Sequence, residues 1–420
     1  MRDNNYNLPI FGVNHEDFGM EWANSCVGEN GFVDNKQYYD GYIEASVKLM
    51  EVILSAEEKN NFETQYWIDT LIYPICFSLR HSIEILLKRI SETVIAISTH
   101  RGRKENISKI ENNTHIHDIG IIWNELRDVA ISNDIRYKNP LLRIEPVILE
   151  MAKIDPTGQT FRYAYNVDSI KHLTGVNIIN IIVLYENTFI LKSDMKYLFE
   201  LNDYLYHEYC LNTFTKNLSR DLIEKLAKDL PLKENWSREL TKEFKTKIMN
   251  KYMISSNELT KVINIISKHY EFSSYIGIEV PLQGIEKNDF FEFLELWLKN
   301  EHVVNAYNLD IENKLSISEL KNIIENEKDS LTYIKPEFIA DLYTLNYFAD
   351  ERDGSEQYKY RYKLKYDEYI SNETSWKMMF DFEHLLLRKT SLLRNILISI
   401  TILNQKSLTK LIYSRCSFLQ

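Results

Sequence analysis

The apolar residues between positions 62 and 99 recur with the period of an α-helix, and this spacing constrains the fold more than any other feature. On a helical wheel of about 100° per residue, one face of the predicted helix carries an apolar stripe. It is formed by Ile72, Ile75, Leu79, Ile83, Leu86 and Ile90. Glycine and proline, which interrupt helices, number only 12 and 8 among 420 residues. Long helical periods with few interruptions predict an all-α fold.

Periodicity also divides the chain into four segments. Residues 1–36 are polar and aperiodic, so we expect an irregular N-terminal arm. Residues 37–212 predict a helical bundle, and residues 213–329 predict a second helical module. Residues 330–420 predict a C-terminal helical module. Within the bundle we expect helices over 37–59, 62–99, 118–131 and 176–211.

Three stretches predict departures from regular helix. Pro74 lies inside the 62–99 helix and predicts a break or a kink. Residues 100–114 are polar and predict a loop. The stretch DPTGQTFRYAYN (155–166) combines turn residues with a short aromatic alternation, which predicts one short β-hairpin.

Two S-x-x-E patterns predict helix starts in the second half of the chain. Ser255 precedes Glu258, and Ser316 precedes Glu319, each at the spacing of a capping box. In this motif the serine oxygen accepts from the backbone amide three residues on, and the glutamate reaches back.

Charge and cysteine usage narrow the class of protein. The formal net charge of −11 argues against a basic protein that binds nucleic acid non-specifically through its overall positive charge. The four cysteines are scattered without a CxxC pair, which favours a reducing compartment. No signal-peptide core begins the chain, and the apolar runs over 177–191 and 392–403 are too short and interrupted to cross a bilayer. We expect a cytoplasmic protein without a membrane segment.

The stretch SLRHSIEILLKR (78–89) places Arg80, Glu84 and Lys88 at every fourth position. Measured from Leu79, Arg80 lies at about 100° on the wheel, Glu84 at about 140° and Lys88 at about 180°. Two interpretations remain open. The row is either a set of solvated ion pairs, worth a few tenths of a kcal/mol each, or a site with Arg80 as its partly buried charge.

The stretch THIHD (114–118) brings ligand-type side chains together. His115, His117 and Asp118 could ligate a metal, but a metal site needs three or four ligands. The alternative is a helix start, in which Thr114 or Asp118 satisfies the free amides. We favour the helix start and expect no metal. The chain has no P-loop, GxGxxG, HExxH or GxSxG pattern, and we expect no cofactor.

The order of these motifs resembles a known family. A helix with the row LRHSIEILLK, followed after a polar loop by HDIGIIW, resembles HEPN-like helical domains. Such domains occur in prokaryotic toxin–antitoxin and phage-defence proteins. The resemblance covers roughly residues 37–210. It implies a helical bundle, a homodimer, and a role on RNA or with a partner protein in a defence assembly.

The resemblance also implies an effector that acts on RNA or a nucleotide. HEPN ribonucleases use an Arg followed by a His, with four to six residues between them, and no His follows Arg80 at that spacing. We hypothesise a substitute group of Arg80 and Glu84 with His117 and Asp118, in which Arg80 stabilises a phosphorane and His117 moves a proton. The alternative is a catalytically inactive scaffold.

Three further stretches suggest nucleic-acid binding. Arg162 is a candidate phosphate contact, against the alternative of a surface Arg on Tyr163 or Phe161. Residues 355–369 alternate tyrosines with Lys359, Arg361, Lys363 and Lys365, which suits single-stranded nucleic acid. For residues 355–369 we favour the alternative to nucleic-acid binding, which is an amphipathic strand with its rings in the core.

Residues 247–269 fit a helix-turn-helix with Asn257, Lys261 and Asn264 on its second helix. This motif leaves a DNA-binding regulator as another candidate function of the chain.

Overall fold

The fold is entirely helical in the part of the chain that the structure describes. This computed structural model describes residues 23–30, 33–58, 64–166, 168–327, 331, 333–349, 354–374 and 376–416. Its named elements run from α1 to α18 with three short 3-10 helices, which confirms the all-α prediction. Most of the expected N-terminal arm, residues 1–22 and 31–32, lies outside the described residues.

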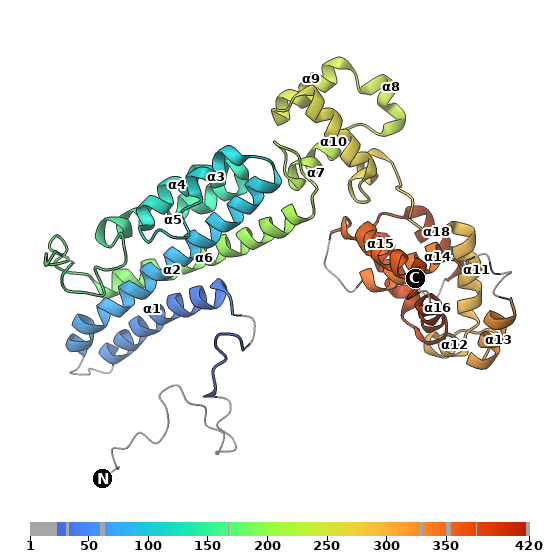
Figure 1. Cartoon of the computed structure of the whole chain (residues 1–420), viewed down its shortest axis with the longest axis horizontal. Helices are drawn as coiled ribbons and strands as arrows, with labels where there is room; N and C mark the ends of the chain where they lie inside the picture. Colours follow the sequence, from blue (N-terminus) through green and yellow to red (C-terminus); the bar gives the residue numbers. More distant parts are fainter. Residues whose placement is uncertain are drawn as a thin grey trace, which may run out of the picture. The chain divides into compact units, whose positions relative to one another are not determined.

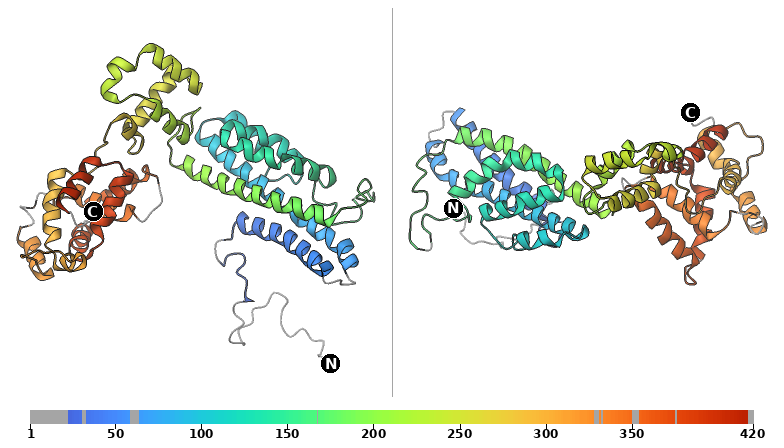
Figure 2. Two further views of the ribbon diagram at one scale, coloured as in Figure 1. Left: turned by 180° about the vertical axis from the view of Figure 1, so that it is seen from behind. Right: turned by 90° about the horizontal axis from the view of Figure 1, so that it is seen from above.

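The chain divides into two compact units, Met1–Tyr206 and His207–Gln420. Figures 1 and 2 show the helices of each unit. We expected boundaries after residues 212 and 329 from the sequence. The division into two units falls a few residues before the first of these, inside the last helix of the N-terminal bundle, and the boundary after residue 329 stays a prediction.

Helix α2 (Thr64–His100) is the central packing element of the N-terminal unit. It packs against α1 (Asn35–Glu58), α3 (Lys104–Ile110) and α4 (Ile119–Asn133), and Figures 1 and 2 show α1 lying beside it. The predicted stripe is the buried face, since Ile75, Leu79, Ile83, Leu86 and Ile90 are at most 2% exposed. The unit is completed by α5 (Lys138–Ile154) and by α6 (Ile181–Cys210) up to Tyr206.

Pro74 does not end α2, which continues through it. Proline removes one backbone donor and leaves the carbonyl four residues earlier without its helical partner. Pro74 is exposed, so water can bind that carbonyl. The predicted break is therefore wrong, and the alternative of a kink stays a prediction.

Residues Tyr66–His100 of α2 are long and apolar enough to cross a membrane, the one such helix within the described ranges. However, 56% of its most apolar window is buried inside the bundle. Core helices of water-soluble proteins pass the same test, so this is weak evidence for a membrane span.

Two sequence predictions in this unit need correction. The 100–114 stretch contains the short helix α3, whose last residue, Ile110, is fully buried. The predicted hairpin is reduced to one antiparallel bridge between Tyr165 and Lys171. The Asn166 side chain accepts from the amides of Asp168 and Ile170 at 3.0 and 2.8 Å. A side chain that binds these amides forms a turn where a ladder would need free donors.

The C-terminal unit contains two hydrophobic cores. The first involves residues 218–276 and is built by α7 (Arg220–Asp229), α9 (Lys242–Tyr252), α10 (Ser256–Lys268) and their short connecting helices α8 (Trp236–Glu239) and η4 (Phe272–Ile276). The second involves residues 270–416. It is built by α11 (Lys287–Leu298), α12 (Glu301–Tyr307), α13 (Ile317–Glu327), α14 (Pro336–Phe348), α15 (Gln357–Ile370), α16 (Trp376–Arg388), α17 (Leu392–Ile402) and α18 (Lys406–Arg415).

Helix α15 replaces the strand that we favoured over residues 355–369. Tyr358, Tyr362 and Tyr366 are spaced by four residues, so they share one face of a helix. Tyr358 is fully buried, and the rings of Tyr362 and Tyr366 stack at 5.9 Å. The predicted strand is therefore wrong, but the prediction that the tyrosines face the core is right for Tyr358, Tyr362 and Tyr366.

Candidate active site

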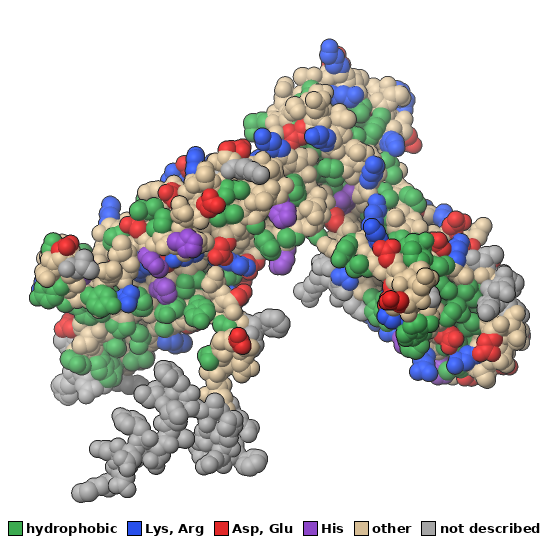
Figure 3. All heavy atoms as spheres, in the orientation of Figure 1, with side chains coloured by type: hydrophobic (Ala, Val, Ile, Leu, Met, Phe, Trp, Pro, Cys, Tyr) green, Lys and Arg blue, Asp and Glu red, His purple; other side chains and the backbone are tan. Residues whose placement is uncertain are grey.

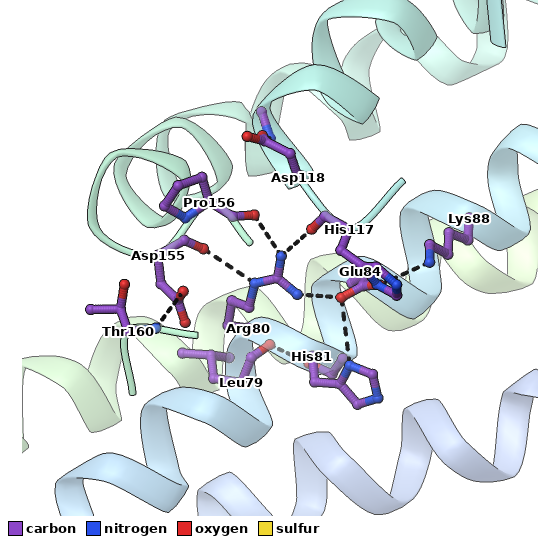
Figure 4. A network of polar contacts seen from close by, with 12 residues as sticks. Leu79, Arg80, His81, Glu84, Lys88, His117, Asp118, Asp155, Pro156 and Thr160 are labelled. Carbon is purple, nitrogen blue, oxygen red and sulfur yellow. Dashed lines mark hydrogen bonds and ion pairs between the residues drawn. The ribbon is translucent and has the colours of Figure 1, made fainter. Parts of the chain in front are cut away.

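Arg80 is buried inside the N-terminal bundle, with 1% of its surface exposed. Its guanidinium forms an ion pair with Glu84 one turn further along α2. The other donors bind main-chain oxygens: Nε donates to Asp155 at 3.2 Å, and Nη2 donates to Pro156 at 2.6 Å and to His117. Figure 4 shows these contacts converging on one guanidinium.

This arrangement explains how a charged side chain is accommodated in the interior. A buried charge is tolerated when it is paired and its donors are hydrogen-bonded. Asp155 and Pro156 follow the last residue of α5, where carbonyls lack helical partners, and His117 immediately precedes the N-cap of α4. Arg80 therefore ties the end of α5 and the start of α4 to the middle of α2.

The loop after α5 fits closely over the guanidinium. Gly158 has a φ of +77°, and a Cβ at this position would lie 3.0 Å from Nη1 of Arg80. Asp155 fixes the same loop, because its Oδ1 accepts from the Thr160 amide at 3.0 Å. With 1% of its surface exposed and its guanidinium bound to Glu84 and to three main-chain oxygens, Arg80 has a structural role in this fold, and the geometry lends no support to the hypothesised phosphate contact.

Glu84 is a buried carboxylate surrounded by donors. Besides Arg80, it contacts Lys88 Nζ at 2.9 Å and His117 Nδ1 at 2.8 Å, and His81 Nδ1 lies at 3.6 Å. Burial by itself raises the pKa of Glu84. Hydrogen bonds from His81, Lys88 and His117, together with the Arg80 charge, outweigh it and hold that pKa well below its usual range.

His117 has one imidazole nitrogen on Glu84 and most of its ring in solvent. Its side chain is 69% exposed, whereas that of Glu84 is 5% exposed. Because Glu84 is ionised, Nδ1 is the donor in this contact. The Nε2 atom is then the nitrogen that can accept or deliver a proton at the surface.

Asp118 acts as the N-cap of α4 and does not contact Glu84. Its Oδ1 accepts from the amides of Gly120 and Ile121 at 2.9 and 3.1 Å. Figure 4 shows its carboxylate turned away from the Arg80 network. This geometry confirms the helix-start interpretation of THIHD, and we remove Asp118 from the catalytic group.

His81 is a site residue that the sequence analysis missed. It is partly exposed on α2, beside Glu84, and its ring stacks on Phe77 at a centroid distance of 5.6 Å. Tyr42 of α1 meets the same imidazole edge-to-face at 4.5 Å. The signal was present in LRHSIE, because His81 lies three residues before Glu84 and so on the same helix surface.

Arg162 also lies against Phe77 and extends this surface. Its guanidinium lies 5.5 Å from the Phe77 ring centroid and 5.1 Å from that of Tyr163. The sequence offered, as the alternative to a phosphate contact, a surface Arg162 packed on Tyr163 or Phe161. Arg162 does pack on Tyr163, and its second aromatic contact is Phe77 rather than Phe161. Arg162 and Tyr163 are both exposed. Figure 3 shows histidine side chains gathered on a face of this unit.

The other predicted nucleic-acid contacts lie on α15 in the C-terminal unit. Lys359 and Lys363 are exposed, and the Lys359 ammonium lies 5.2 Å from the Tyr270 ring centroid. Arg361 is half-buried and lines a surface cavity of about 530 Å³ with Tyr343 and Tyr347. On the helix Lys359 and Lys363, four residues apart, share one face, whereas Arg361 lies on another side, so the three cations do not form the single row that a strand would give.

No group of three or more His, Cys, Asp or Glu side chains suited to a metal ion occurs among the described residues. The comparisons with protein-family models, with curated proteins and with solved structures found no match for this chain.

Proposed function

We propose that the N-terminal bundle cleaves RNA by acid–base catalysis, with His117 and His81 as the proton-transfer groups. The observation that carries this proposal is the 2.8 Å contact between the exposed His117 imidazole and the buried Glu84 carboxylate. A carboxylate behind an imidazole fixes its tautomer and stabilises its protonated form. As the HEPN-like resemblance implies, the chain would serve as an effector in a prokaryotic defence or toxin system.

The chemistry needs two proton transfers and no metal. His117 Nε2 removes the proton of a ribose 2′-hydroxyl, and the 2′-oxygen attacks the adjacent phosphorus. The bond from phosphorus to the 5′-oxygen breaks, and the leaving oxygen takes a proton from protonated His81. The products are a 2′,3′-cyclic phosphate and a 5′-hydroxyl. Imidazoles suit both roles because their ordinary pKa lies near neutrality.

The surface beside the two imidazoles suits single-stranded RNA. Tyr163 is 53% exposed and offers a ring on which a base can stack. Arg162, stacked on that ring, offers a cation for a phosphate. Arg80 holds Glu84 and the residues before α4 in place, and it acts through them rather than on the substrate.

The test is an incubation of the full chain with end-labelled tRNA and total cellular RNA in EDTA. We expect discrete cleavage, lost at least about 100-fold in His117→Ala and His81→Ala. The matched control is His115→Ala, an exposed histidine two residues from His117. Products should resist 3′-end ligation until the cyclic phosphate is opened and the phosphate that remains is removed. Cleavage that needs a divalent metal, or that survives in His117→Ala, would contradict the mechanism.

A second candidate function, an inactive scaffold, draws support from the surface of α6. Phe189 and Ile190 are 62% and 64% exposed, and Ile182 and Val183 are 54% and 55% exposed. Their spacing places them on one stripe of the helix. Exposed apolar stripes of this kind mark interaction surfaces. The partner we propose is a second copy of this chain, as the resemblance implies.

Light scattering of the purified chain, together with the RNA-cleavage assay, separates the two functions. The scaffold predicts a dimer that Phe189→Glu converts to a monomer, with no RNA cleavage in any variant. Thr188→Ser, a buried conservative change beside the stripe, should leave the mass unchanged. A monomeric wild-type chain would reject the dimeric scaffold.

A further inference from the structure

Helices α9 and α10 form a helix-turn-helix in the C-terminal unit. Three residues, Met253 to Ser255, separate the two helices. Met253 adopts the left-handed conformation with φ 51° and closes α9, since its amide donates to Met249. Ser255 opens α10 by accepting from the Glu258 amide at 3.2 Å. A short turn of this kind reverses the chain abruptly and presents the second helix.

The two sides of α10 differ sharply in chemistry. Leu259, Val262 and Ile266 are buried in the first core. The opposite side is exposed and carries only polar and basic side chains, at positions Asn257, Thr260, Lys261, Asn264 and Lys268. These five positions fall within about 100° of one another on a helical wheel. The one acid of the helix, Glu258, is buried away from this face.

Charge concentrates in the same region of the chain. Residues 213–276 contain twelve Lys or Arg and eight Asp or Glu, which gives +4 against −11 for the whole protein. Three of the twelve basic residues are exposed lysines of α9, at positions 242, 245 and 247. Figure 3 shows basic side chains distributed over the part of the unit that Figure 1 labels α8 to α10.

The start of α10 is held by the preceding segment. The Glu258 carboxylate accepts from Thr215 Oγ1 at 2.5 Å and from Asn217 Nδ2 at 2.6 Å. These contacts join the segment before α7 to the first turn of α10. The first turn of α10 is thus tied to a second segment of the chain, and recognition of base edges requires a recognition helix that is held in place.

We infer that α10 docks in the major groove of duplex DNA. A helix about 10–12 Å wide fits a groove about 12 Å wide. Asn257 and Asn264 carry the amide pair that reads adenine, and Lys261 carries a donor for guanine. The lysines of α9 lie on the helix that crosses the phosphate backbone in this motif. The inference involves the C-terminal unit and is independent of the RNA chemistry proposed above.

The test measures binding of the full chain to labelled duplex DNA by fluorescence anisotropy across a range of salt concentrations. The logarithm of affinity should fall linearly with the logarithm of salt concentration. Lys261→Ala should weaken binding about tenfold, and replacement of each α9 lysine by alanine should reduce the slope by about one. Lys410→Ala, an exposed helical lysine on α18, is the matched control and should change neither. Thermal melting of each variant checks that it is folded.

A selection from random duplexes provides the second readout. The wild type should enrich a sequence motif, and Asn264→Ala should lose that enrichment while retaining its salt slope. Equal binding to single-stranded RNA and duplex DNA, or duplex binding unchanged in Lys261→Ala, would overturn the inference. RNA cleavage by Lys261→Ala should match the wild type, so failure here is distinguishable from failure of the proposed ribonuclease.

Discussion

The Nδ1 atom of His117 lies 2.8 Å from the Oε1 atom of Glu84. This contact joins a ring that is mostly in solvent to a carboxylate that is almost completely buried. The carboxylate stays ionised because Arg80 and Lys88 neutralise it from the protein side. The surface histidine therefore has a fixed orientation, and the interior supplies the groups that fix it.

Replacing Glu84 by glutamine should destabilise the N-terminal unit by about 3–5 kcal/mol, because it leaves the buried Arg80 without its counter-charge. Urea unfolding at pH 7 measures this loss. The control is Glu44→Gln, which removes a half-exposed ion pair with Lys192 and should cost less than about 1 kcal/mol. Equal losses in the two variants would mean that the Arg80 pair contributes no more than a surface pair.

The same comparison should depend on pH in a defined direction. Glu84 has a pKa below its usual range in the folded state. Its stabilisation is therefore complete above the unfolded pKa of about 4.3, and it is lost as pH falls through the lower folded pKa. The advantage of the wild type over Glu84→Gln should shrink between pH 5 and pH 3. An advantage that grows on acidification would contradict this assignment.

Gly158→Ala should be more destabilising than Gly102→Ala. Both glycines have positive φ, +77° and +69°, so both variants incur the backbone cost of about 1–2 kcal/mol. Only at Gly158 would the new Cβ press on the Arg80 guanidinium, which adds about 1–3 kcal/mol. Chemical denaturation of the two variants gives the comparison. Equal costs would show that the loop does not pack tightly on Arg80.

Asp341→Asn should show the opposite pH dependence in the C-terminal unit. Burial raises the pKa of Asp341 to about 6, although Tyr358 and the amides of Gly284 and Ile285 donate to it. A raised carboxyl pKa means that stability is lost as pH rises from about 4 to 6. The advantage of the wild type over Asp341→Asn should thus be smaller at pH 7 than at pH 4. Urea unfolding with hydrogen-exchange labelling of α14 peptides measures it, and a constant difference would refute the prediction.

Helical periodicity was readable from the sequence where one apolar stripe dominates, as in α2. It failed at α15, where every second residue from Tyr358 to Tyr362 is aromatic and hides the four-residue spacing. The S-x-x-E spacing also predicted a reciprocal capping box at Ser255 and Glu258. The serine does cap α10, but the glutamate binds Thr215 and Asn217 and does not reach back to the serine amide. The pair Ser316 and Glu319 does form the reciprocal box. Sequence spacing alone does not reveal which distant donors compete for a carboxylate.

The candidate site was only partly predictable for the same reason. The sequence brought Glu84 and His117 into one hypothesis, but a wheel of α2 alone places Glu84 about 140° from the core. In the structure His117 contacts Glu84 directly, and the loop after α5 binds the neighbouring Arg80 on the same part of α2. The contribution of His81 depends on Tyr42 and Phe77, which stack with it from α1 and from the preceding turn of α2.

The most direct test of the central claim is the initial rate of RNA cleavage in EDTA for the wild type, His117→Ala and His115→Ala. The account predicts cleavage by the wild type and by His115→Ala at similar rates, and a rate at least about 100-fold lower for His117→Ala. Equal rates in all three proteins, or no cleavage by the wild type, would contradict the claim that Glu84 and His117 form a ribonuclease site.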